Sequence, residues 1–84
     1  MKRSELMAEL NRMAETVEEE TGVELVRLLF IKDHGRRVLR ITINKEGGVE
    51  LKDCENFSRA FSKLLDEEDL IQERYFLEVE SPGI

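Results

Sequence analysis

The sequence predicts a single α+β domain in which a three-stranded sheet carries two helices on one face. Two segments have the apolar spacing of amphipathic helices, and three others are rich in β-branched and large apolar residues. With 84 residues, the chain can form one hydrophobic core and is too short to form two. The expected order of the elements along the chain is αββαβ.

The first expected element is a helix over Ser4–Thr21. Ser4 is a favourable N-cap, and Gly22 suits the left-handed position that follows the last turn of a helix. Between them, apolar residues recur at intervals of three and four, which predicts one buried stripe. The stripe consists of Leu6, Leu10, Met13, Ala14 and Val17.

Two strands follow over Val23–Lys32 and Arg37–Asn44, joined in a hairpin by a turn at residues 33–36. In Val23–Lys32 both sets of alternate positions are largely apolar, which is typical of a strand in the middle of a sheet. The second strand alternates cleanly. Its aliphatic side consists of Leu39, Ile41 and Ile43, and its polar side of Arg40, Thr42 and Asn44.

The second helix is expected to begin at Asp53 or at Leu51, after the glycine pair Gly47-Gly48 has ended the strand. A third strand, Tyr75–Val79, alternates between apolar and acidic residues and ends before Ser81. The buried stripe of this helix is expected to consist of Cys54, Phe57, Ala60, Phe61, Leu64 and Leu65.

The predicted sheet order is 2-1-3. The second strand, the second helix and the third strand form a crossover unit, so the third strand should run parallel to the second. With the first strand between them, every neighbouring pair would be antiparallel. Both helices would cover one face of the sheet, and the other face would present Arg40, Thr42, Glu78 and Glu80.

No combination of residues predicts a catalytic centre, a metal site or a cofactor site. His34 is the only histidine and Cys54 the only cysteine, so a metal cluster and a cysteine–histidine nucleophile are both unsupported. The acidic run at residues 66–69 lacks the spacing of a calcium loop, and Gly47-Gly48 lacks the residues of a Walker loop. We expect a non-enzymatic protein in which His34 is an exposed turn residue and Cys54 a small buried one.

Charge is divided unevenly along the chain, whose net charge is −6. Residues 27–45 contain six basic residues and one acidic residue, whereas the segments before and after are acidic. Guanidinium groups suit paired contacts with phosphate, and a protruding hairpin can reach into a groove of nucleic acid. The alternative is a solvated hairpin whose cations pair with the acidic surface of its own domain. The candidate residues are Arg36, Arg37, Arg40, Lys32 and Lys45.

Four segments occur in an order and spacing that resemble a known family. They are Arg37-Val38-Leu39-Arg40, the glycine-pair stretch from Ile43 to Glu55, the helix from Phe57 to Asp66, and the end from Tyr75 to Ile84. Together they resemble the N-terminal domain of the bacterial ribosome maturation factor RimP. The resemblance covers the whole chain and is most specific from Arg37 to Ile84. The chain departs from the family at Asn44, where aspartate is usual, and at Glu80, where serine is usual.

The resemblance implies a cytoplasmic, non-enzymatic assembly factor for the small (30S) ribosomal subunit, which contacts 16S rRNA and a small-subunit ribosomal protein. A factor that binds one assembly intermediate more tightly than a misfolded competitor shifts the population towards it. In that role we expect Arg36, Arg37 and Arg40 to be the main RNA contacts, with Lys32 and Lys45 as secondary ones. The alternative function is a protein–protein interaction or dimerisation module that makes no RNA contact.

The resemblance also bears on domain organisation. Members of the family continue past the Ser-Pro-Gly motif into an SH3-like β-barrel, whereas this chain ends at Ile84. We expect residues 1–84 to form one domain, with Ser81, Pro82 and Gly83 at the boundary to a second domain that this chain lacks. A cytoplasmic location also fits the single cysteine and the longest apolar run, Leu28–Ile31, which is far too short to cross a membrane.

Overall fold

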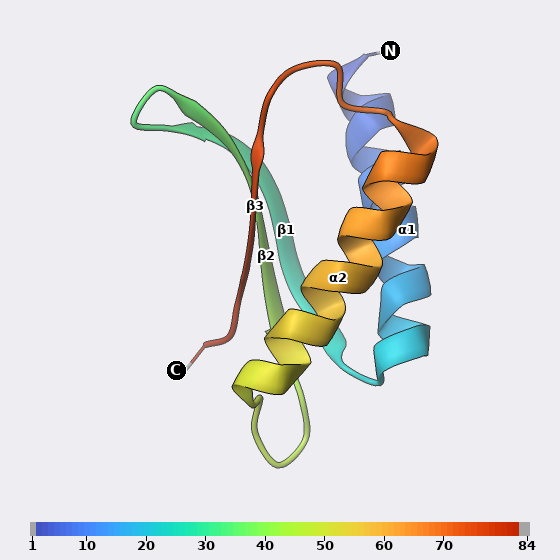
Figure 1. Cartoon of the computed structure of the whole chain (residues 1–84), viewed down its shortest axis with the longest axis vertical. Coiled ribbons are helices and arrows are strands. Elements are labelled where there is room, and N and C mark those ends of the chain that lie inside the picture. The colour runs from blue at the N-terminus through green and yellow to red at the C-terminus, as the bar shows by residue number, and fades with distance from the viewer. Residues whose placement is uncertain (1, 83–84) are drawn as a thin grey trace.

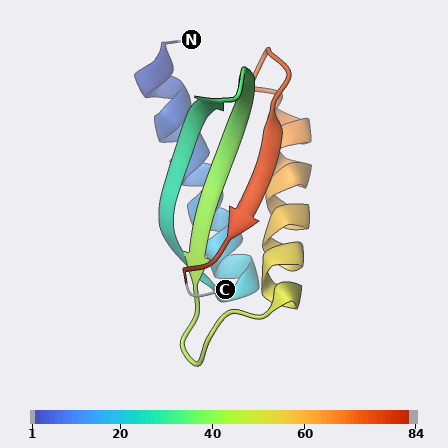
Figure 2. The same cartoon turned by 90° about the vertical axis from the view of Figure 1, so that its left-hand side faces the viewer.

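The structure is a computed structural model of the chain and describes residues 2–82. Its three strands form one sheet, and both helices lie on the same face of that sheet (Figure 1 and Figure 2). The predicted α+β class and the αββαβ order are therefore confirmed. The elements are α1 (Arg3–Thr21), β1 (Glu24–Asp33), β2 (Arg36–Asn44), α2 (Leu51–Glu68) and β3 (Phe76–Glu80).

The predicted strand order is wrong. The order in the sheet is β1-β2-β3, so β2 is central and β1 lies at an edge. β2 pairs antiparallel with β1 and parallel with β3, which gives a mixed sheet. The crossover through α2 does make β3 parallel to β2, as expected, but β3 lies directly beside β2 and makes a parallel ladder with it.

A β-bulge explains why both sets of alternate positions in β1 are apolar. The pairing with β2 skips Val26, which is the extra residue of the bulge and is 52% exposed. The bulge transfers the core-facing positions from one alternate set to the other, so Leu25 packs on the core before it, and Leu28 and Phe30 are buried after it. The apolar content of both sets thus reflects this change of phase, which the sequence pattern alone does not distinguish from a strand buried on both faces.

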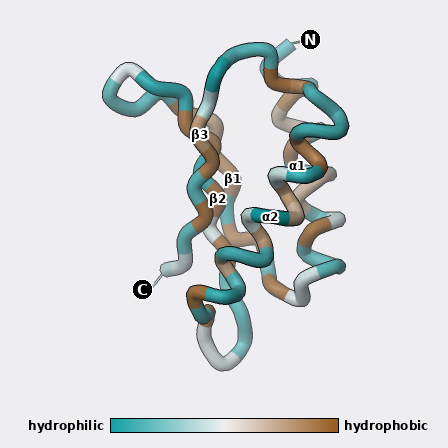
Figure 3. Tube along the Cα trace, in the orientation of Figure 1, coloured by the Kyte–Doolittle hydropathy of each residue, from teal (hydrophilic) through white to brown (hydrophobic). Residues whose placement is uncertain are grey.

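The core lies between the sheet and the two helices. The aliphatic side of β2 faces the helices and is completely buried, as predicted. Phe57 and Phe61 of α2 are also completely buried, and their rings are stacked with centroids 6.0 Å apart. Cys54 is half-buried at the edge of this core and does not lie inside it. In contrast, Figure 3 shows the tip of the β1–β2 hairpin and the loop before β3 as largely hydrophilic.

The helix ends differ in part from the expectation. Helix α1 begins at Arg3, so Ser4 lies in its first turn and is not its cap, while Gly22 ends it with φ of 75°. Helix α2 begins at Leu51 with a reciprocal capping box, in which Asp53 and Glu50 each bond the backbone of the other. Neither of these helices, within the part of the chain that the structure describes, is long and apolar enough to span a membrane.

Candidate nucleic-acid interface

The structure divides the five predicted RNA-binding residues among three places. Lys32, Arg36 and Arg37 lie at the end of the β1–β2 hairpin, where Lys32 pairs with Arg37 in the ladder. Arg40 lies on the open face of the sheet, opposite the helices and beside Glu78 in register. Lys45 follows β2 at the other end of the sheet. The structure therefore brings three of the five residues together.

A tight turn brings the cations of the hairpin close to one another. His34 and Gly35 form the tip, with φ of 51° and 79°. Two central residues with positive φ are typical of the turn that matches the twist of a β-hairpin. As predicted, His34 is an exposed turn residue, with 86% of its side chain exposed. Because the turn is this short, Asp33 pairs directly with Arg36 in the ladder, and Arg36 and Arg37 lie immediately beside the tip.

A surface hollow of about 310 Å³ lies beside the hairpin and is lined mainly by cationic side chains. One aromatic ring, that of Phe76, lines it as well and is 39% exposed. The guanidinium of Arg36 lies over this ring at 4.8 Å from its centroid, and that of Arg74 at 5.8 Å. Cation–π contacts of this kind position a guanidinium while its N–H donors stay available to a ligand. The lining consists of Lys32, Gly35, Arg36, Arg37, Glu73, Arg74 and Phe76.

A second aromatic ring, that of Phe30, also lies among the cations. The guanidinium of Arg37 lies 5.3 Å from its centroid and that of Arg3 lies 5.7 Å from it. Arg3 also donates a hydrogen bond to the backbone carbonyl of Phe30. Three separate segments, namely α1, the hairpin and the loop before β3, thus contribute cations to one surface. We call this surface the basic hairpin end, and define it as Arg3, Lys32, Arg36, Arg37 and Arg74.

Two cations of the basic hairpin end, Arg3 and Arg74, were not predicted from the sequence. A signal for Arg74 was present, because a third strand parallel to the second must begin at the hairpin end of the sheet, and Arg74 comes just before that strand. Phe76 pairs with Val38 in the structure, which places Arg74 beside the start of β2. No sequence pattern indicates Arg3, since its position depends on the direction in which α1 crosses the sheet.

Several of the predicted cations already have partners within the domain. Arg37 pairs with Glu73 at 2.8 Å, and Lys45 pairs with Asp53 at 3.1 Å. Arg40 pairs with Glu78 at 2.9 Å and with Asp33 at 3.4 Å. These three cations therefore fit the alternative of a hairpin paired with its own acidic surface.

Other cations at the hairpin end have no carboxylate partner. Across residues 2–82, no ion pair involves Lys32, Arg36 or Arg74. The Arg40 guanidinium, by contrast, donates to Glu78, and this hydrogen bond raises the pKa of Arg40 above its ordinary value. A cation that is already paired must give up a carboxylate before it can bind a phosphate. The residues without a partner are therefore better suited to an anionic ligand.

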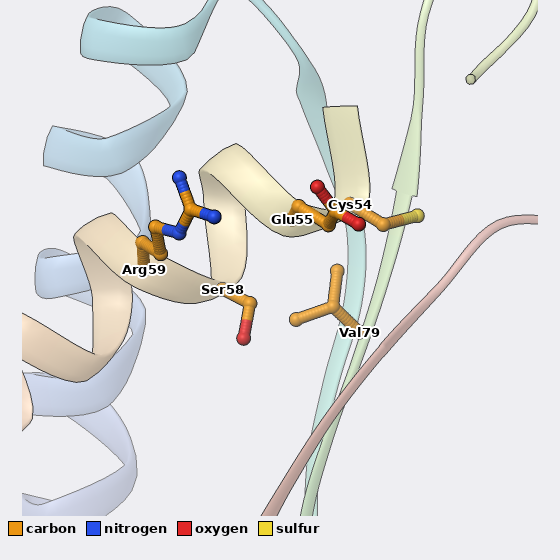
Figure 4. A pocket seen from close by; sticks show the side chains of 5 residues that line it. All are labelled: Cys54, Glu55, Ser58, Arg59 and Val79. Carbon is orange, nitrogen blue, oxygen red and sulfur yellow. The ribbon is translucent and has the colours of Figure 1, made fainter. Parts of the chain in front are cut away.

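A separate hollow of about 400 Å³ lies between α2 and β3 (Figure 4). Burial, followed by the charge of Asp53, raises the pKa of the Cys54 thiol on its wall. A raised pKa disfavours the reactive thiolate, and no histidine lines the hollow. Within residues 2–82, no group of three or more His, Cys, Asp or Glu side chains could hold a metal ion. The lining consists of Cys54, Glu55, Ser58, Arg59 and Val79.

Residues 13–84 match the family described as the RimP N-terminal domain. The chain belongs to this family. The match spans the C-terminal half of α1 and all of β1, β2, α2 and β3, so it confirms the resemblance noted in the sequence. RimP is a ribosome maturation factor, and membership of its family indicates a role in assembly of the 30S subunit. The family is one of assembly factors and does not belong to a known enzyme class. Within the basic hairpin end, only Arg3 lies outside the residues that match the RimP domain.

Proposed function

We propose that this domain assists maturation of the 30S subunit by binding 16S rRNA through the basic hairpin end and a small-subunit ribosomal protein through another surface. Membership of the RimP family supports the ribosomal setting. The observation that carries the RNA contact is the gathering of cations from three segments on a protein of net charge −6. An acidic protein can approach RNA only through a local surface of opposite charge.

The exposed ring of Phe76 favours RNA over a simple anion as the ligand, whereas the Phe30 ring is buried in the core. Phe76 is 39% exposed beside the hollow, between Arg36 and Arg74. Unpaired bases stack on exposed aromatic rings and on guanidinium planes, while the backbone phosphates bind cations. The basic hairpin end therefore offers both kinds of contact that a single-stranded segment of rRNA requires.

The ion pairs divide the cations by role in this proposal. Lys32, Arg36 and Arg74 make the main phosphate contacts because no carboxylate in the described chain neutralises them. Arg37 joins them after releasing Glu73, whose side chain is 53% exposed. The remaining two predicted residues, Arg40 and Lys45, mainly hold the sheet and the start of α2 together through their ion pairs.

The test is the salt dependence of the domain's affinity for immature 30S subunits. We expect the combined change Lys32→Ala, Arg36→Ala and Arg74→Ala to lower the log–log slope of affinity against salt by about two to three units, since each phosphate contact contributes about 0.7–0.9. A matched control removes three exposed cations from α2 through Lys52→Ala, Arg59→Ala and Lys63→Ala. The control should leave the slope nearly unchanged.

Two outcomes would contradict the proposal. Equal slope changes in the two triple variants would mean that RNA responds only to the net charge of the domain. Undiminished binding of the first variant to immature 30S subunits would favour the alternative of a protein–protein interaction module. Circular dichroism of both variants checks that the domain remains folded.

We further propose that Ser81, Pro82 and Gly83 form the boundary to an SH3-like second domain, and that the protein acts in the cytoplasm, where bacterial ribosomes are assembled. β3 ends at Glu80, directly before this motif. Pro82 is exposed and has no backbone N–H with which to extend the ladder. Gly83 lies outside the described residues.

A further inference from the structure

The two edges of the sheet are protected to different extents, and the edge at β1 is blocked by α1. The backbone N–H of Leu25 donates to the carboxylate of Glu18 at 2.7 Å. The backbone carbonyl of Phe30 accepts a hydrogen bond from Arg3. Between these two points the bulge at Val26 interrupts the regular ladder. Side-chain caps and bulges of this kind prevent another strand from pairing with an edge.

The edge at β3 has no such protection. β3 pairs with β2 on one side, and among residues 2–82 no segment pairs with its other side. No side chain in that part of the chain bonds the backbone of Phe76–Glu80. A row of backbone donors and acceptors therefore remains free to pair with an extended segment.

Helix α2 extends sideways beyond this free edge, so a strand added there would pack against the helix (Figure 2). Figure 4 shows the side chains of Ser58 and Val79 pointing towards the gap between α2 and β3, which contains the hollow of about 400 Å³. A second hollow of about 240 Å³ adjoins it, because Cys54 and Val79 line both. Leu51, on the wall of the second hollow, is 74% exposed. The first turn of the helix thus presents Leu51 and Cys54 as an apolar patch that the three strands leave uncovered, and the polar side chains of Glu55, Ser58 and Arg59 follow it along the helix.

The alternation of β3 defines the chemistry of a partner. Leu77 and Val79 pack towards the helices, whereas Glu78 and Glu80 lie on the open face. Residues directly opposite in neighbouring strands interact most strongly when they are apolar pairs or opposite charges. We infer that the free edge of β3 binds an extended segment of another protein, with apolar residues facing α2 and lysine or arginine on the open face beside Glu80, since Glu78 is already paired with Arg40.

The same glutamates argue against a second copy of this chain as the occupant. Two β3 strands paired with each other would bring rows of glutamate together, and like charges directly opposite are destabilising. A short, acidic edge strand resists pairing with its own kind, and it attracts a strand of opposite charge. The edge is therefore selective for a basic partner, whether or not the hairpin end binds RNA.

The probe is a short synthetic peptide in which valine and lysine alternate, added to the 84-residue chain. We expect it to slow the hydrogen exchange of the β3 amides and to shift NMR signals in β3 and in the first turns of α2. The same peptide with every backbone nitrogen methylated keeps its charge but lacks all backbone donors, and it should not bind. The change Glu80→Lys should weaken binding about tenfold, since it converts an attractive cross-strand pair into a repulsive one.

The matched control is Glu24→Lys, which makes the same charge change on the open face at the opposite edge of the sheet. It should leave the affinity for the peptide nearly unchanged, as should the triple alanine variant of the hairpin end. Absence of binding, equal binding of the N-methylated peptide, or unchanged exchange of the β3 amides would each overturn the inference. Dimers of the chain formed through β3 would overturn it as well.

Discussion

Replacement of Phe61 by alanine tests the core that holds α2 against the sheet. Phe61 is completely buried in the middle of α2. Its ring stacks on that of Phe57 with centroids 6.0 Å apart and an angle of 19° between the planes. The substitution removes the ring, leaves a cavity between helix and sheet, and ends the aromatic contact.

The expected loss in the free energy of unfolding is about 3–5 kcal/mol, which is typical of replacing a buried phenylalanine with alanine. About 0.5–1.5 kcal/mol of this comes from the aromatic pair. A domain of 84 residues has a total stability of about 4–13 kcal/mol at the usual 0.05–0.15 kcal/mol per residue. Loss of this one ring would therefore remove a large part of the stability and, at the low end, unfold the domain.

Urea denaturation followed by circular dichroism measures this loss. The matched control is Leu51→Ala, which removes an apolar side chain from the same helix at a position that is 74% exposed. The control should change the stability by no more than about 0.5 kcal/mol. A loss below about 1 kcal/mol for Phe61→Ala, or equal losses for the two variants, would refute the described packing of α2.

Two further predictions concern the start of α2. The Cys54 thiol should react with a thiol reagent more slowly in the native protein than in urea, because burial raises its pKa and limits access; equal rates would contradict this. The backbone N–H of Glu50, at 2.9 Å, and then Lys45 hold the pKa of Asp53 below its ordinary value. This depressed pKa stabilises the fold above the unfolded value of about 3.9, and the stabilisation is lost as pH falls through the folded pKa. Melting temperatures between pH 2 and 7 should therefore fall less in acid for Asp53→Asn than for the control Glu55→Gln, and equal acid dependence would contradict the capping role.

The sequence was sufficient to predict the elements because their patterns are local. Stripes at helical spacing and alternation in β2 gave the two helices, the hairpin and the side of β2 that faces the core. The strand order depended on one interpretation, that apolar residues at both alternate sets of β1 indicate a central strand. The bulge at Val26 produces the same pattern in an edge strand, and a bulge of one residue has no signature in this sequence.

The candidate site was predictable to the extent that it is local. Lys32, Arg36 and Arg37 are close in sequence and lie together in the structure. Arg3 and Arg74 join them only through tertiary contacts with Phe30 and Phe76. The ion pairs of Arg40 were equally hidden, because its acidic partner Glu78 is 38 residues away and becomes adjacent only through the parallel β2–β3 ladder.

The parallel β2–β3 ladder also determines which charged residues lie together at each end of the sheet. Its first pair, Val38 and Phe76, lies beside Arg36 and Arg74 at the hairpin end. Its last pair, Thr42 and Glu80, lies at the opposite end, towards the start of α2. A ribosomal subunit is made of RNA and basic proteins, so it offers a ligand to each end of β3. If each end binds as proposed, a variant that combines the triple alanine change of the hairpin end with Glu80→Lys will lose affinity for immature 30S subunits by the sum of the two separate losses in binding free energy. The two losses are independent because the changed side chains share no partner.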